Sequence, residues 1–225
     1  MKNNFVDVWV GDVLSQKIES NDYWSMLNGD EREKAMTFIR LELQQKYIKT
    51  RGRLRRVLSS YLKIEPQQIQ IKVGQYGKPY LEHNSLHFNL SHSKNKIVIA
   101  VSNCSEVGVD VEEYRQQRNL KGLVEKCFSE QEQLYWYSLS EQQKSFMFYH
   151  FWVRKEAFVK AVGRGIALGL DQCVLNDDLN SFSKIPDCHG RASDWKIVDI
   201  PIDENIFCVL VCKAIEYQYK QVSFR

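Results

Sequence analysis

The chain lacks the sequence features that place a protein in a membrane or direct it across one. No stretch approaches the ~20 consecutive apolar residues that a membrane span needs. The N-terminal segment alternates polar and apolar residues, and it has neither the apolar core nor the small-residue cleavage site of a secretory signal. We therefore expect a cytoplasmic protein that binds no membrane.

Common metal-binding and nucleotide-binding signatures are also missing. The six cysteines form no C-x-x-C pair and no cysteine–histidine spacing typical of a zinc site, so we expect them to be reduced and mostly buried. There is neither a P-loop nor a G-x-G-x-x-G motif, so side chains would have to hold any nucleotide phosphate. The net charge of +3 is too small to favour a class of partner by itself.

One cationic segment stands out against this mild net charge. Residues 46–56 hold six Lys and Arg side chains and no acidic one. Such a run is a candidate nucleic-acid site. The same helix must also bury Leu54, Leu58 and Tyr61, however, and this pattern is more typical of an amphipathic surface helix. An anionic small molecule or an acidic protein would suit the cationic face equally well.

The hydrophobic pattern predicts a similar order of helices and strands twice. Helices are expected over 30–62, with a break near Thr50 to Gly52, and over 117–127, 129–138 and 141–163. Strands are expected at 5–10, 68–73, 96–102, 107–112, 171–175, 195–200 and 206–213, with a short extended segment at 86–90. The strands 96–102 and 107–112 are expected to pair as a hairpin. This order indicates a mixed α/β (α+β) chain of two halves, residues 1–105 and 106–225.

Two acidic side chains, Asp110 and Glu112, lie two residues apart in an apolar strand. Alternation along a strand puts both on one face and puts Val109 and Val111 on the other. Two carboxylates on one face repel each other unless a cation lies between them, and a few hard oxygen ligands suit Mg²⁺. The spacing alone is more typical of a solvated strand face, so a metal site here needs a third ligand.

The helix expected at 141–163 offers such a ligand. Glu156 and Lys160 are one turn apart and share a helix face. Taken alone, the pair is typical of a surface ion pair. Several aromatic residues indicate that this helix is packed, and a carboxylate on a packed helix is costly unless it meets a cation. Glu156 could complete a metal site with Asp110 and Glu112, and Lys160 would then lie within reach of a phosphate oxygen.

Ser91 and His92 are neighbours in the segment N-L-S-H-S at 89–93. Adjacent residues of an extended chain face opposite sides, so the two cannot form the hydroxyl–imidazole bond of a serine hydrolase. A lone histidine is more often structural than functional, yet Ser and His at a strand end can donate to a phosphate. The preceding turn, Gly77-Lys78-Pro79, adds a rigid backbone and a cation.

Four motifs in order resemble a known family. They are G-K-P (77–79), N-L-S-H-S (89–93), G-V-D-V-E (108–112) and W-x-x-K-E-A-x-x-K (152–160), and the stretch G-R-G-I-A-L-G-L-D (163–171) also fits. Together they resemble the Sfp-type 4′-phosphopantetheinyl transferases over roughly residues 30–170. The resemblance implies a pseudo-twofold duplication of two α/β subdomains, with coenzyme A contacts in the N-terminal half, the metal site and catalytic helix in the C-terminal half, and the active site between them.

The resemblance also implies an activity. Such enzymes transfer the 4′-phosphopantetheine arm of coenzyme A to a serine of an apo carrier protein (an acyl, peptidyl or aryl carrier domain), use Mg²⁺ or alternatively Mn²⁺, and release adenosine 3′,5′-bisphosphate. The carrier could belong to fatty acid, polyketide or nonribosomal peptide biosynthesis. We expect a monomer that binds no nucleic acid. Two other classes stay open: a non-catalytic module that binds coenzyme A or a carrier, and, less favoured, a nucleic-acid-binding protein that uses residues 46–56.

By position, the resemblance assigns a role to each matching residue. It implies metal ligands at Asp110, Glu112 and Glu156, and a contact between Lys160 and the coenzyme A phosphates. It implies further coenzyme A contacts at Lys34, Arg51, Lys78, Pro79, Ser91 and His92. Glu132 matches an acidic position with an acid/base or metal-linked role, although S-x-x-E at 129–132 predicts a helix cap equally well. The expected catalytic set is Glu156, Lys160, Glu132 and His92, and the acceptor of the serine proton is Glu156, Glu132 or a metal-bound water.

Overall fold

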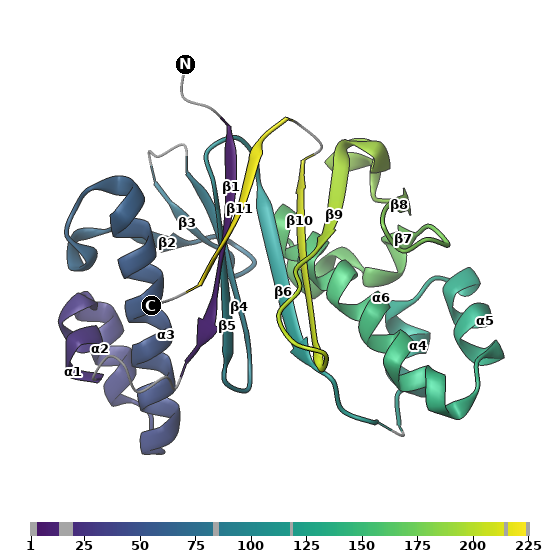
Figure 1. The fold of residues 1–225 in the computed structure, drawn as a ribbon, viewed down its shortest axis with the longest axis horizontal. Helices are drawn as coiled ribbons and strands as arrows, with labels where there is room; N and C mark the ends of the chain where they lie inside the picture. Colours follow the sequence, from purple (N-terminus) through teal and green to yellow (C-terminus); the bar gives the residue numbers. More distant parts are fainter. Residues whose placement is uncertain (1–3, 14–19, 83–85, 118, 214–215, 224–225) are drawn as a thin grey trace.

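The computed structural model describes residues 4–13, 20–82, 86–117, 119–213 and 216–223. Two β-sheets face each other in the middle of the molecule, and helices cover the outer face of each sheet (Figure 1). The strands are β1 (Phe5–Asp12), β2 (Ile71–Val73), β3 (Pro79–Leu81), β4 (His87–Ser93), β5 (Lys96–Ser102), β6 (Val107–Glu113), β7 (Val174–Leu175), β8 (Phe182–Lys184), β9 (Trp195–Asp199), β10 (Ile206–Lys213) and β11 (Gln218–Ser223). The α-helices are α1 (Ser20–Met26), α2 (Gly29–Met36), α3 (Leu41–Leu62), α4 (Lys121–Cys127), α5 (Glu130–Ser138) and α6 (Glu141–Val162).

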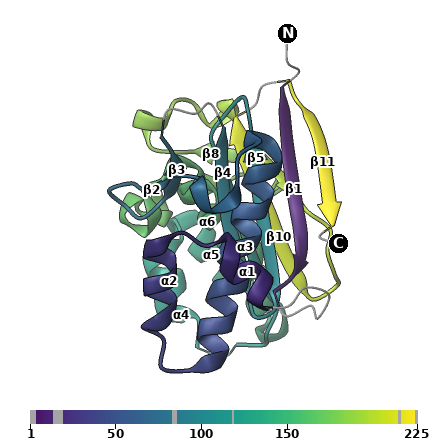
Figure 2. The same ribbon diagram turned by 90° about the vertical axis from the view of Figure 1, so that its left-hand side faces the viewer.

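The first sheet has the strand order β11-β1-β5-β4, and α3 packs on its outer face. Alternation in β5 explains both faces of this sheet, because Ile97 and Ile99 pack toward α3 whereas Val98 and Ala100 face the second sheet. Figure 2 shows α1, α2 and α3 in front of this sheet. None of the described helices is both long enough and apolar enough to cross a membrane.

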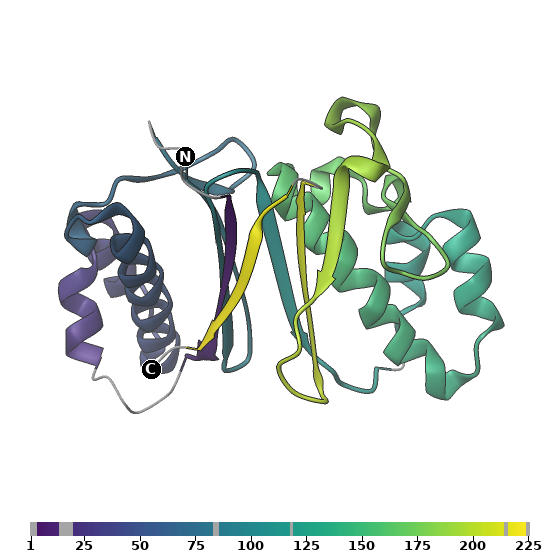
Figure 3. The ribbon, with the colours of Figure 1, turned by 45° about the horizontal axis from the view of Figure 1, so that its top comes forward.

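The second sheet has the strand order β6-β10-β9, and α6 packs on its outer face. In Figure 3 the two sheets are seen side by side, each with its helices on the outer face. A glycine sets the distance between α6 and β6, because a Cβ atom at Gly108 would lie 2.0 Å from the carbonyl oxygen of Ala157 and 2.3 Å from the amide nitrogen of Ala161. The backbone of α6 therefore lies directly against β6.

The C-terminal strand joins the two halves. β11 pairs in parallel with β1, with Phe5 opposite Gln218 and Val10 opposite Ser223. In Figure 1 this yellow strand lies beside the purple first strand. Residues from the end of the chain thus complete the sheet of the N-terminal half. The mixed α/β (α+β) class is confirmed, whereas the pseudo-twofold duplication stays a prediction.

Two local predictions are wrong. The segments 96–102 and 107–112 do not pair as a hairpin, because β5 pairs with β1 and β4 while β6 pairs with β10. The break near Thr50 to Gly52 is also absent, since α3 is continuous and the interruption comes earlier, between α2 and α3. Gly52 instead provides space for α1, because a Cβ atom there would lie 2.6 Å from the Cδ1 atom of Tyr23.

Candidate functional site

The free edge of β6 is closed by side chains of β4 rather than by another strand. Asn89 Oδ1, Ser91 Oγ and Ser93 Oγ accept hydrogen bonds from the backbone amides of residues 109, 111 and 113, at 2.9, 3.3 and 3.3 Å respectively. These three side chains project from one face of β4, because they lie at alternate positions. The N-L-S-H-S segment therefore satisfies the backbone of the opposite half, as an edge strand requires.

The same two hydroxyls contact the predicted acids. Ser91 donates to Asp110 Oδ1 at 3.0 Å, and Ser93 donates to Glu112 Oε2 at 2.9 Å. Ser91, which the family resemblance places near adenosine bisphosphate, thus lies against a carboxylate of the other half. It connects the N-terminal segment to the acidic face of β6.

Two side chains of α6 lie near this face. Lys160 Nζ lies 2.5 Å from Asp110 Oδ1 and 3.0 Å from Ser91 Oγ. Glu156 lies one turn earlier on α6. The close approach of α6 to β6 at Gly108 positions both side chains near the carboxylates of β6. The structure therefore brings together Asp110, Glu156 and Lys160 from segments that are distant in the sequence.

The negative charge of Asp110 affects the pKa values of the two neighbouring acids, Glu112 and Glu156. Burial and the charge of Asp110 raise the pKa of Glu156 to about 7, with a further contribution from Glu112 and a partial offset by Lys160. Burial and the charge of Asp110 also raise the pKa of Glu112, which the hydrogen bond from Ser93 partly offsets. Like-charged acids held this close favour a cation between them.

Two buried oxygen atoms indicate that these residues suit a metal ion. Asp110 Oδ2 and Glu156 Oε1 have no hydrogen-bond partner among the described residues, although both are shielded from solvent. Buried polar atoms normally have a partner, so a cation at this position would satisfy them. Hard carboxylate oxygens are the donors that Mg²⁺ and Mn²⁺ prefer.

The carboxylates of Asp110, Glu112 and Glu156 are suitable metal ligands, but they do not yet surround a single point. No three His, Cys, Asp or Glu side chains in the described part of the chain already converge on one point at ligand distances. Lys160 holds Asp110, and Ser93 holds Glu112. These side chains would have to shift before all three acids could share one ion.

A cleft of about 190 Å³ opens beside Lys160. It is lined by the turn of residues 76–79, by Asn89 and Leu90 of β4, and by the end of α6 with Val159, Lys160, Gly163 and Gly165. Gly163 ends the helix with φ of 71°, in the left-handed region that favours glycine. The cleft brings together the G-K-P turn, the N-L-S-H-S strand and the end of α6.

Lys78 lines this cleft, but its ammonium group binds the protein backbone. Lys78 Nζ donates to the carbonyl oxygens of Val107 at 3.2 Å and Ala161 at 2.5 Å. Burial lowers its pKa to about 8. These two hydrogen bonds tie the turn to β6 and α6, and the contact between Lys78 and coenzyme A stays a prediction. Pro79 begins β3 and also lines the cleft.

Arg51, the predicted phosphate contact of the basic run, pairs with an acidic side chain of another helix, and its contact with coenzyme A stays a prediction. Its Nε donates to Glu31 Oε1 of α2 at 2.7 Å, and Arg55 contacts the other oxygen of the same carboxylate. Arg53 is also buried and donates to the backbone carbonyl of Val13 at 2.7 Å. Residues 46–56 therefore do not form one continuous cationic face, and this weakens the nucleic-acid interpretation.

Lys46 is the cation of this run that the sequence interpretation missed. His92 is an exposed residue, yet its neighbours partly desolvate its ring. This desolvation and the charge of Lys46, with a smaller contribution from Lys160, lower the pKa of His92. Lys46 therefore lies close enough to the site to act on it electrostatically. The predicted contact Lys34 lies exposed on α2, with its ammonium 5.9 Å from the centre of the Phe38 ring.

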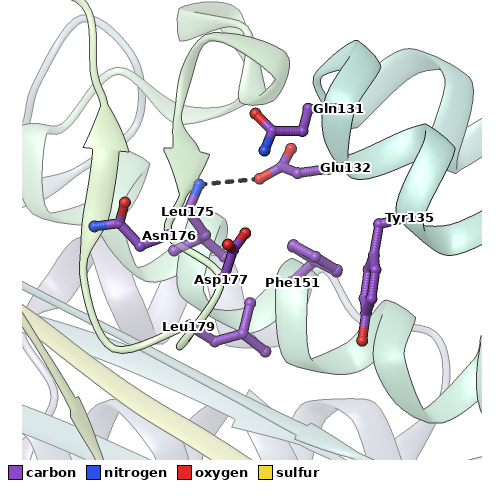
Figure 4. A pocket seen from close by; sticks show the side chains of 8 residues that line it. All are labelled: Gln131, Glu132, Tyr135, Phe151, Leu175, Asn176, Asp177 and Leu179. Atoms are coloured by element: carbon purple, nitrogen blue, oxygen red, sulfur yellow. Dashed lines mark hydrogen bonds between the residues drawn. The ribbon is translucent and has the colours of Figure 1, made fainter.

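Glu132 has a structural role. Its Oε2 accepts from the Ser129 amide at 2.8 Å and from Lys155 Nζ at 2.6 Å, and its Oε1 accepts from the Leu175 amide at 3.0 Å (Figure 4). Both partners of this ion pair are buried, and burial lowers the pKa of Lys155. Because both oxygens of Glu132 are engaged, it is a poor candidate for a proton acceptor.

A larger hollow, of about 400 Å³, lies beside Glu132 in the C-terminal half. Figure 4 shows it between α5, α6 and the segment that follows β7, with Tyr135 and Phe151 on one side and Leu175 and Leu179 on another. Lys160, which contacts Asp110, lines the smaller cleft and does not line this hollow. This contact with the acidic face of β6, rather than volume, identifies the smaller cleft as the candidate site.

Comparisons with known proteins identify one family. Two family models match: residues 16–104 match the model described as "4′-phosphopantetheinyl transferase, N-terminal", and residues 106–210 match the "4′-phosphopantetheinyl transferase superfamily". The protein slr0495 of Synechocystis sp. is 32% identical over 80% of this chain and 74% of its own length. The 4′-phosphopantetheinyl transferase HetI of Nostoc sp. is 29% identical over 96% of this chain and 90% of its own length. The 4′-phosphopantetheinyl transferase Sfp of Bacillus subtilis (strain 168) is 28% identical over 79% of both chains.

Proposed function

The chain belongs to the 4′-phosphopantetheinyl transferase superfamily, and from this premise we propose how its own residues carry out the reaction. As an enzyme of this class, it transfers phosphopantetheine from coenzyme A to a carrier protein. We propose that the acceptor is a serine of the apo carrier, that transfer requires Mg²⁺ or Mn²⁺, and that adenosine 3′,5′-bisphosphate leaves. Both halves contribute to the site, so a monomer suffices.

One observation carries the metal-dependent part of this proposal. Asp110 and Glu156 come from different segments, the charge of Asp110 acts on Glu156, and each keeps a buried oxygen atom that lacks a partner among the described residues. With Glu112 they would hold the ion. When bound, the ion would supply positive charge that stabilises the charge developing on the leaving phosphate.

The remaining chemistry comes from the chain itself. Lys160 lies between Asp110 and the cleft, so its ammonium group would bind a phosphate oxygen of coenzyme A. Ser91 and Ser93 orient the carboxylates of Asp110 and Glu112 by hydrogen bonding. The cleft beside them positions the coenzyme relative to the serine hydroxyl, which attacks the β-phosphorus.

Glu156 is the better of the two carboxylate candidates for the serine proton. Both oxygen atoms of Glu132 already accept hydrogen bonds, whereas Glu156 Oε1 has no partner in the described residues. His92 remains a proposed contact of the coenzyme, with Lys46 as an additional cation on the same side.

Mass spectrometry of an apo carrier protein tests the proposal. The carrier should gain the mass of 4′-phosphopantetheine when it is incubated with this protein, coenzyme A and Mg²⁺, and the gain should disappear in EDTA. Asp110→Ala should abolish the gain while the fold is retained, because the variant loses a metal ligand. Transfer at the wild-type rate by Asp110→Ala, or transfer that is unaffected by EDTA, would refute the metal assignment.

A further inference from the structure

Lys160 has two competing partners in this site. Its ammonium lies 2.5 Å from Asp110 Oδ1, and Ser91 hydrogen-bonds both groups, with 3.0 Å to the ammonium and 3.0 Å to the carboxylate oxygen. Asp110 is therefore held by a cation of the protein itself. The proposed function assigns the same ammonium to a phosphate of coenzyme A, so one side chain is required in two places.

Accessibility places Lys160 on the entry route to Asp110. The side chain of Asp110 is 4% exposed, whereas that of Lys160 is 28% exposed. Lys160 lines the cleft and Asp110 does not. An ion that enters from the cleft meets the ammonium first. A positive charge in this position repels a cation that approaches Asp110, although the ammonium pairs with Oδ1 and leaves Oδ2 without a partner among the described residues.

We propose that Lys160 covers Asp110 as a displaceable latch, which a divalent ion must release before it binds, and that the released ammonium then becomes the phosphate contact. This inference rests on the proposed function. It explains why Asp110, Glu112 and Glu156 are near each other without forming a closed cage. The latch also keeps the most buried of the three acids paired with a cation, which limits the cost of burying its charge.

The latch makes an unusual prediction for metal affinity. Removing a positive charge that competes with the ion should tighten metal binding, even though the variant loses a residue needed for transfer. Lys160→Met should bind Mn²⁺ roughly tenfold more tightly than the wild type in the absence of coenzyme A, because two linked cations at one carboxylate oppose each other by a factor of this order. Its rate of transfer should nevertheless fall.

Titration with Mn²⁺, followed by the electron paramagnetic resonance signal of the free ion, measures this affinity directly. Lys160→Arg keeps the positive charge and should bind Mn²⁺ as weakly as the wild type. Lys144→Met is a matched control, because Lys144 lies on the same helix, pairs with Glu141 and is 18% exposed. Its Mn²⁺ affinity should equal that of the wild type.

The outcomes separate the latch from the proposed function. The latch is supported if Lys160→Met binds Mn²⁺ more tightly than the wild type while Lys160→Arg and Lys144→Met do not. If Asp110→Asn abolishes Mn²⁺ binding but Lys160→Met binds no more tightly than the wild type, the latch is wrong and the metal site stands. If Asp110→Asn binds Mn²⁺ as well as the wild type, with and without coenzyme A, both the latch and the proposed metal site are wrong.

Discussion

We expect the ionised carboxylate of Glu156 to lower the free energy of unfolding, although transfer requires this residue. Its carboxyl group is largely buried beside Asp110, and Oε1 has no partner among the described residues. Ionising such a group is costly in the folded state and inexpensive in the unfolded chain. Glu156→Gln keeps the shape of the side chain and removes the charge. We therefore expect this variant to be more stable and much less active than the wild type.

The raised pKa gives the magnitude and the pH window. In the folded protein the pKa of Glu156 rises from the ordinary 4.5 to about 7. Between these two values the folded state binds more protons than the unfolded state, so the free energy of unfolding falls as the pH rises. At about 1.4 kcal/mol per pKa unit, the full loss is on the order of 3 kcal/mol. It is absent below pH 4.5 and complete above pH 7.

Urea denaturation in EDTA, at pH 5 and at pH 8.5, tests this reasoning. Glu156→Gln should exceed the wild type in stability by about 3 kcal/mol at pH 8.5 and by little at pH 5. Glu141→Gln is the control, because Glu141 lies on the same helix with its side chain 83% exposed. The reasoning fails if Glu156→Gln gains nothing at pH 8.5, or if it gains as much at pH 5.

Two further substitutions test the packing and the role of Glu132. Gly108→Ala would place a methyl group 2.0 Å from the carbonyl oxygen of Ala157, so we expect thermal unfolding to show a loss of about 3 kcal/mol, whereas Gly122→Ala, with no atom within 4 Å of the added carbon, should show none. An unchanged melting temperature for Gly108→Ala would contradict the close packing of α6 on β6. Glu132→Gln leaves Lys155 buried with a neutral partner and should cost about 3–5 kcal/mol, but the rate of transfer per folded molecule, measured at low temperature, should stay near that of the wild type. A large fall in that rate without a loss of stability would restore Glu132 as a catalytic residue.

Local periodicity explains why the main acids could be predicted from the sequence. Asp110 and Glu112 share a strand face because the side-chain period of a strand is two, and Glu156 and Lys160 share a helix face because they are one turn apart. These relations do not depend on the rest of the fold. The sequence therefore predicts which side chains act together within each segment, and the motif order predicts that the segments meet.

Partners across segments were harder to predict, because they depend on packing between distant elements. The apolar strands β5 and β6 follow each other in the sequence, yet they belong to different sheets, since the β4 side chains close the edge of β6. Arg51 and Lys46 belong to one cationic run. Glu31 of another helix pairs with Arg51 and not with Lys46. A positive charge in a sequence does not reveal whether a carboxylate elsewhere already neutralises it.

The ammonium of Lys78 illustrates the same limit. The G-K-P motif places Lys78 beside the cleft, as expected, but the carbonyl groups that it binds come from β6 and from the end of α6. Neither acceptor can be identified from the turn itself. Only the folded arrangement of both halves shows that the ammonium of Lys78 joins backbone segments.

A crystal structure with coenzyme A and Mn²⁺, with the ion located by its anomalous scattering, tests the central claim most directly. We predict one ion in contact with Asp110, Glu112 and Glu156, and Lys160 moved from Asp110 to a phosphate oxygen of the coenzyme. An ion bound elsewhere, or Lys160 still on Asp110 with the ion in place, would contradict the account.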